Sequence, residues 1–173
     1  LGVSISFLEE MWSRNLGHLF ASPLRPLEMV AALIVMSLIR TLIGIIPATL
    51  LAWLFFGYSV YDIGLPLVLF FANLMLFGWA MGIALSGLVL RFGMGAESLS
   101  WAAIFALAPI SGIYYPLSVL PDWLQVIARC LPSSYVFEGM RAVLIEQRFD
   151  AGLMQAGLLL NLGYFAAGAW IFL

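Results

Sequence analysis

Few side chains in this 173-residue chain could do chemistry. The single histidine, His18, and the single cysteine, Cys130, exclude a multi-histidine metal centre, a cysteine-based zinc site and an internal disulfide within the chain. The apolar stretches hold no Ser–His, Cys–His or paired-carboxylate arrangement, and a phosphate-binding G-x-x-x-x-G-K-S/T loop is absent. We therefore expect no catalytic residue, no metal and no cofactor, and no ATP hydrolysis by this chain itself.

One charged residue, Arg40, stands out because it lies inside a long apolar stretch, 27–56. It is about a dozen residues, or roughly 18 Å, from the start of that stretch. A charge near the middle of a bilayer costs about 2.5–3.5 kcal/mol, so Arg40 should face other helices, a water-filled path or a carboxylate. Alternatively, the helix is long and tilted, and the side chain reaches back to the membrane surface. Arg40 and the neutral Asn73 are our candidates for a transport path.

The composition excludes a soluble globular domain. Hydrophobic residues make up 64% of the chain and charged residues 9%, against about 45–50% and about 25% in typical soluble domains. The remaining polar surface could not cover a particle in water. A formal net charge of −2 gives no basic surface for nucleic acid. We therefore predict an all-α integral membrane protein, a polytopic helical bundle surrounded by lipid.

Four apolar stretches are long enough to cross a bilayer, at about 20 residues per span. They are 27–56, which contains Pro47, then 65–90, then 99–120, which contains Pro109, and finally 151–173. Small residues in the second and fourth stretches would let helices approach closely, unless they only reflect a glycine-rich composition. These residues are Gly78, Gly82, Ser86, Gly157, Gly163 and Gly168.

The segment 5–20 is predicted to be an amphipathic helix that does not cross the membrane. Its apolar residues recur every three or four positions, as on one helical face. They are Ile5, Leu8, Trp12, Leu16 and Leu19. Ser6 and Glu9 fit a capping box at the start of this helix. Such a helix either lies on the membrane surface or docks against a partner, and the sequence leaves both open.

The segment 121–150 is predicted to form two short re-entrant or interfacial helices. Asp122 could cap the first, ending at Leu131, and Ser134 could cap the second, reaching about Gln147. Glu138 and Arg141 are three residues apart and could pair on one helical face. The pair is either a solvated surface pair or partly buried, and the apolar neighbourhood favours partial burial.

The arginines give an incomplete topology. Arg14, Arg25 and Arg91 put residues 1–26 and the turn 91–98 in the cytoplasm, with 57–64 outside. The segment 121–150 then falls outside although it carries three arginines, which breaks the rule.

Three motifs, in their order relative to the apolar stretches, resemble one known family. They are LFASPL at 19–24, PISG at 109–112 followed by LPDWL at 120–124, and LPSSY at 131–135 followed by EGMR at 138–141. In this order they resemble the ABC-2 family of ABC exporter permeases. The family often has Asn where Leu131 stands. The resemblance implies a fragment holding about the last four of six transmembrane helices.

The resemblance also implies roles for particular residues. Segment 5–20 would contain a cytoplasmic coupling helix that docks on an ATPase, and 121–150 would be external. The implied ATPase contacts are Glu9, Glu10, Trp12, Arg14 and Leu16. The implied outer gate consists of Pro109, Tyr115, Glu138 and Arg141.

The function implied is that of the permease subunit of an ATP-driven exporter in the cytoplasmic (inner) membrane of a bacterium. It would move a drug, lipid or (lipo)saccharide-type cargo outwards by alternating access. A second permease subunit, in a homodimer, and a separate ABC ATPase that binds ATP and magnesium would be its partners. The alternative is a membrane assembly or structural subunit that transports nothing.

Overall fold

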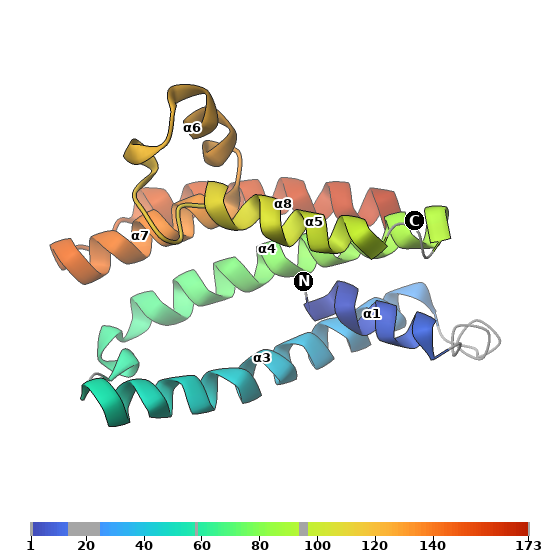
Figure 1. The fold of residues 1–173 in the computed structure, drawn as a ribbon, viewed down its shortest axis with the longest axis horizontal. Helices are drawn as coiled ribbons and strands as arrows, with labels where there is room; N and C mark the ends of the chain where they lie inside the picture. Colours follow the sequence, from blue (N-terminus) through green and yellow to red (C-terminus); the bar gives the residue numbers. More distant parts are fainter. Residues whose placement is uncertain (1, 14–24, 58, 94–96, 173) are drawn as a thin grey trace.

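The computed structural model describes residues 2–13, 25–57, 59–93 and 97–172, and within these ranges it contains helices and no strand (Figure 1). The helices are α1 (Gly2–Trp12), α3 (Pro26–Phe56), α4 (Leu65–Phe92), α5 (Glu97–Ile110), α6 (Asp122–Arg129), α7 (Pro132–Glu146) and α8 (Ala151–Phe172). Two short 3-10 helices, η1 (Val60–Ile63) and η3 (Leu117–Val119), lie in the connections. The predicted all-α class is confirmed.

Three of the helices are long and apolar enough to cross a membrane: Glu28–Phe56, Leu65–Phe92 and Ala151–Phe172. Their residues are apolar around much of the helix, and many large apolar side chains are exposed, as expected where lipid replaces water. Arg40, near the middle of the first span, is an exception. The chain is a multi-pass membrane protein.

The prediction of one span over 99–120 is wrong. Helix α5 is 14 residues long and ends at Ile110, which at 1.5 Å per residue is roughly 21 Å, short of the about 30 Å of a bilayer core. The helix stops because Gly112 takes a left-handed conformation with φ 72°, a common way to end a helix. Pro116, which has no N–H to donate, follows before η3 begins.

Three predicted helix starts are also wrong. Helix α1 already begins at Gly2, so Ser6 lies inside it and is buried. Helix α6 has Pro121 at its N-cap and ends at Arg129, and α7 has Leu131 at its N-cap. Pro132 takes the first position of α7, where a missing N–H costs nothing, so Ser134 falls within that helix.

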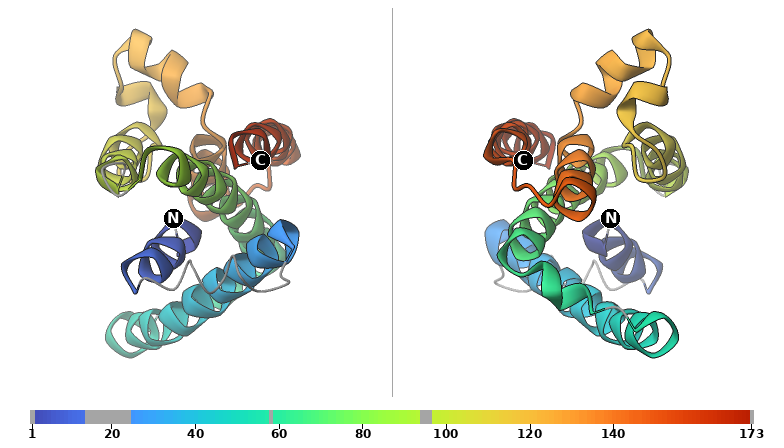
Figure 2. Two further views of the ribbon diagram at one scale, coloured as in Figure 1. Left: turned by 90° about the vertical axis from the view of Figure 1, so that its right-hand side faces the viewer. Right: turned by 90° about the vertical axis from the view of Figure 1, so that its left-hand side faces the viewer.

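Helix α4 is the centre of the bundle. End views place α3 on one side of α4, α5 and α8 on the other side, and α6 at the edge farthest from α3 (Figure 2). Helices α8, α7 and α1 pack against α4, and α1 also packs against α3. The buried side chains of α4 include Phe70, Phe77 and Ile83. Helix α4 thus contacts more elements than the other described helices do, and Arg91, near its end, is its charged residue.

Glycines set the close approach of α4 and α8. A Cβ on Gly168 would lie 2.7 Å from the carbonyl oxygen of Ala80. A Cβ on Gly87 would lie 2.9 Å from the Cα of Phe172. Gly157 is buried as well. Gly163, by contrast, has open space around it, so the predicted helix contact at this glycine is wrong. Close backbone contact through small residues holds helices together in lipid.

Two asparagines join the same helices. The side-chain amide of Asn161 donates a hydrogen bond to the backbone carbonyl oxygen of Asn73 at 2.8 Å and another to the side-chain oxygen of Asn73. The Asn73 amide donates to the Met154 carbonyl oxygen at 3.2 Å. Each asparagine is 1% exposed. The structure therefore places Asn73 in the contact between α4 and α8, where its polar atoms bind α8.

Gly168→Ala should destabilise the protein by about 1–3 kcal/mol, the usual cost of overpacking, because the new methyl group meets the backbone of α4. Gly163→Ala is the matched control on the same helix, and it should be neutral or slightly stabilising. The free energy of unfolding in detergent micelles measures both. Equal effects of the two substitutions would contradict the close packing of α4 and α8 at Gly168.

Candidate functional site

An ion pair on α7 fixes the loop that follows α5. The Arg141 Nη1 donates to the Glu138 Oε1 at 2.7 Å, and these side chains are only 22% and 27% exposed. The Arg141 Nη2 donates to the Gly112 carbonyl oxygen at 2.9 Å, and the Leu117 amide donates to the Glu138 Oε1 at 2.9 Å. Partial burial of this pair, favoured by the sequence, is confirmed. Charged partners make such hydrogen bonds stronger than neutral ones.

A second contact closes the loop on itself. The Tyr115 hydroxyl donates to the carbonyl oxygen of Pro109 at 2.5 Å. The residues predicted for an outer gate thus form two separate sets of contacts around the same loop, Tyr115 with Pro109 and the Glu138–Arg141 pair with Gly112 and Leu117. We call Pro109, Tyr115, Glu138 and Arg141 the loop cluster. It joins the end of α5 to α7, while η3 begins within the loop at Leu117.

The sequence did not reveal the backbone partners of the loop cluster. Gly112 and Leu117 contribute a carbonyl and an amide, and every residue type carries those groups. Only the glycine at 112 gave a local signal, because the left-handed conformation that exposes its carbonyl favours glycine.

A second ion pair joins α1 to α3. The Arg40 Nη2 lies 2.6 Å from the Glu9 Oε2, and the Arg40 Nη1 lies 3.2 Å from the Glu9 Oε1, a bidentate arrangement. The side chains of Arg40 and Glu9 are 44% and 46% exposed. The hydrogen bond from Arg40 lowers the pKa of Glu9. Among the alternatives for Arg40, a carboxylate partner is therefore confirmed, and it comes from within the chain.

Helix α1 lies against the chain's own spans. Leu8 is 2% exposed and packs with Val89 of α4 and with Met29 and Leu33 of α3. Figure 1 shows α1 beside the first half of α3 and the last part of α4. The sequence had offered the membrane surface or a separate partner, and this packing within the chain is a third arrangement.

The residues predicted to contact an ATPase divide into different environments. Glu9 is turned towards α3, whereas the Trp12 side chain remains 47% exposed at the end of α1. Glu10 lies next to Glu9 and is half-buried. Arg14 and Leu16, like the rest of the predicted helix up to residue 20, lie outside the described residues. Among the predicted ATPase contacts that the structure describes, Trp12 therefore exposes the most apolar surface.

The polar contacts of the bundle join its elements to one another. Within the described ranges, no three His, Cys, Asp or Glu side chains gather to hold a metal ion. The Glu9–Arg40 pair connects two helices, whereas the Glu138–Arg141 pair lies on one helix and connects to the loop after α5 through its backbone hydrogen bonds. Both sets of contacts hold the elements in the arrangement observed here.

These features define a class: a multi-pass helical membrane protein whose polar contacts join helices within the bundle. Comparison with known families gives its membership. The profile of the ABC-2 type transporter family matches residues 1–145, and the chain belongs to this family of ABC transporter membrane permeases. The resemblance drawn from the three motifs is confirmed.

One curated relative agrees with this assignment. The chain is 28% identical over 145 residues to ABC transporter G family member 20 of Dictyostelium discoideum. The matched region covers 83% of this chain and 20% of the relative, so the chain spans about one fifth of that protein's length. No solved structure gives a significant match to this chain.

Glu138→Ala should release the loop after α5. It removes the acceptor for the Leu117 amide and leaves Arg141 without its carboxylate, so we expect a loss of about 1.5–3 kcal/mol in local stability. Hydrogen exchange at the Leu117 amide measures the change. Glu146→Ala is the control on the same helix, because that side chain is 59% exposed and lies 3.5 Å from Arg148. Unchanged protection of Leu117 in Glu138→Ala would contradict the assigned contact.

Acid should loosen the contact between α1 and α3. Because Arg40 holds the pKa of Glu9 below its ordinary value of 4.5, the pair contributes fully above pH 4.5 and is lost as the pH falls through the lowered pKa. Spin labels on cysteines introduced at Ser13 and Met36, in a Cys130→Ala background, report the distance between the helices. Glu9→Gln should abolish the transition, and an unchanged transition in that variant would assign it to another group.

Proposed function

We propose that this chain is part of the permease of an ATP-driven exporter that moves a drug, lipid or (lipo)saccharide-type cargo out of the cell. The proposal is supported by membership of the ABC-2 type transporter family and by a relative named as an ABC transporter. Helix α4 has no charged residue before Arg91, and α8 has none. The lack of charge in these spans favours a neutral or amphipathic cargo over a small ion. ATP and magnesium would be bound by a separate ATPase chain.

The observation that carries the proposal is the attachment of α1 to two spans at once. Leu8 packs between α3 and α4, and Glu9 pairs with Arg40 about four turns into α3. A force applied to α1 by an ATPase would therefore reach both spans directly. In this proposal Trp12 contacts the ATPase, together with Glu10, and the Glu9–Arg40 pair transmits the movement. Arg40 then acts as a link in the transport path rather than as a group that binds cargo.

At the opposite end of the bundle, the loop cluster would act as the outer gate. Outward opening requires α5 to move relative to α7, which would break the bond between Arg141 and the Gly112 carbonyl. ATP binding can shift the equilibrium only by the difference in its free energy of interaction with the closed and open states. The loop cluster contributes to the free-energy difference between the closed and open states, because its hydrogen bonds would exist only in the closed state.

Two copies of the permease, with two ATPases, would form the complete exporter in the cytoplasmic membrane of a bacterium. The exposed apolar face of α3 is available to lipid or to the second copy. This face includes Ile43, Ile46, Leu50 and Phe55. The apolar surface that α3 exposes must be covered by one or the other.

Trp12→Ala should uncouple the complete permease from its ATPase. A buried aromatic anchor at an interface commonly contributes 2 kcal/mol or more, so we expect about a 30-fold loss in affinity for the ATPase. Binding and permease-stimulated ATP hydrolysis are measured on the reconstituted complex in nanodiscs. Trp123→Ala is the control, since this tryptophan is 66% exposed on α6. If both variants retain stimulation, α1 is not the coupling element.

The same complex distinguishes a transporter from a structural subunit. Spin labels on α7 and on the loop at Ile113 should separate when ATP is added and return after hydrolysis. A permease that binds its ATPase but never changes this distance would support the alternative, a membrane assembly subunit that transports nothing.

A further inference from the structure

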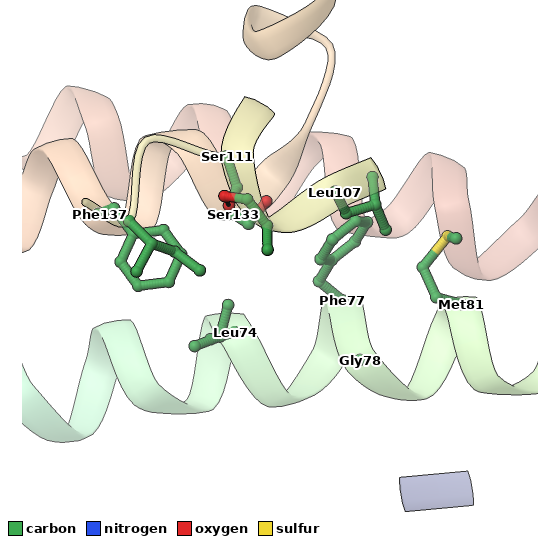
Figure 3. A pocket seen from close by; sticks show the side chains of 10 residues that line it. Leu74, Phe77, Gly78, Met81, Leu107, Ser111, Ser133 and Phe137 are labelled. Atoms are coloured by element: carbon green, nitrogen blue, oxygen red, sulfur yellow. Dashed lines mark hydrogen bonds between the residues drawn. The ribbon is translucent and has the colours of Figure 1, made fainter. Parts of the chain in front are cut away.

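A cavity of about 290 Å³ lies between α4, α5 and α7 (Figure 3). Its walls are almost entirely apolar, and no charged side chain contributes to them. The apolar side chains that line the cavity include Leu74, Phe77 and Met81 of α4, Leu107 of α5 and Phe137 of α7. This is just below the usual volume of a small-molecule site, about 300–1,000 Å³.

Two serines, Ser111 and Ser133, are among the residues that line the cavity. Ser133, at the start of α7, is 4% exposed, and its Oγ has no hydrogen-bond partner. The Ser111 hydroxyl donates to the Ala108 carbonyl oxygen at 3.0 Å, which leaves its own oxygen able to accept. Figure 3 shows both serines on the wall across from Leu74. A buried hydroxyl without a partner is unfavourable, so a ligand that bonds to it gains affinity.

We propose that this cavity binds a neutral single-chain lipid that carries one hydroxyl group, with the hydroxyl on Ser133. A volume of about 290 Å³ is at the low end for a small-molecule site, which favours a single-chain ligand over a two-chain phospholipid. The absence of a cation in the lining disfavours a carboxylate or a phosphate, which would be buried without a countercharge. A hydroxyl matches the serines because it can donate to the Ser111 oxygen and accept from Ser133. The chain of the ligand lies along Phe77 and Met81.

The inference is independent of the export proposal. The site is formed by three helices of one copy, so its occupation requires neither an ATPase nor a second copy. Equilibrium binding without nucleotide therefore tests the cavity, and failure of that test would leave the coupling experiment with Trp12 unaffected.

The experiment is photolabelling of the complete protein, purified in nanodiscs, with a diazirine derivative of hexadecanol. We expect adducts on the peptides of α4 and α5 that line the cavity. Unlabelled hexadecanol should compete for the site, and the carboxylate palmitate should compete at least ten-fold more weakly. Ala108→Phe, which fills the cavity, should abolish the adducts.

Ser133→Ala should weaken competition by hexadecanol about five-fold, the effect of one ordinary hydrogen bond. Competition by hexadecane should not change. Ser134→Ala is the matched control, because Ser134 is the next residue of α7, is 0% exposed and also lacks a partner for its hydroxyl, yet it does not line the cavity. The proposal is overturned if the cavity peptides are not labelled in the complete protein, if palmitate competes as well as hexadecanol, or if the two serine variants behave alike.

Discussion

The constraint on which this structure depends is the low dielectric of the bilayer, which leaves a polar side chain only partners from within the protein. Three contacts meet that constraint here. Glu9 binds Arg40, Asn73 binds Asn161, and Glu138 binds Arg141. The first two contacts join different helices directly, and the third fastens the loop after α5 to α7. A few polar groups in an apolar chain therefore determine which elements are neighbours.

The rest of the packing follows from the same constraint. Because lipid chains are as apolar as the side chains, burying a leucine between helices gains little over leaving it in lipid. Helices α4 and α8 are instead held by close contact at Gly87 and Gly168, next to the asparagine pair. By contrast, α3 has few contacts with α4 and shows much of its apolar surface. The bundle is thus firm around α4 and α8 and looser around α3.

The sequence predicted the features that depend on composition and local spacing. It predicted the spans that α3, α4 and α8 form, the need of Arg40 for a partner, and the pairing of Glu138 with Arg141. It could not identify Glu9 as the partner of Arg40, because 31 residues separate them and chain folding alone brings them together. The end of α5 was missed for a related reason. The apolar composition of 99–120 is the same whether the chain continues as a helix or turns at Gly112. The caps were missed because hydroxyls within helices α1 and α7 look like capping residues.

The two ion pairs differ in burial, and this difference orders their strengths. The side chains of Glu9 and Arg40 are almost half exposed, so solvent screens their attraction and weakens the pair. The Glu138–Arg141 pair is only 27% and 22% exposed, and it adds hydrogen bonds between charged groups and the backbone, each worth about 1.5–3 kcal/mol. In the proposed function, a movement that begins at α1 passes first through the weaker Glu9–Arg40 pair, and it strains the Glu138–Arg141 contacts only when α5 is displaced. In that proposal, small fluctuations of α1 would leave the loop cluster intact, and its opening would require a sustained input such as ATP binding.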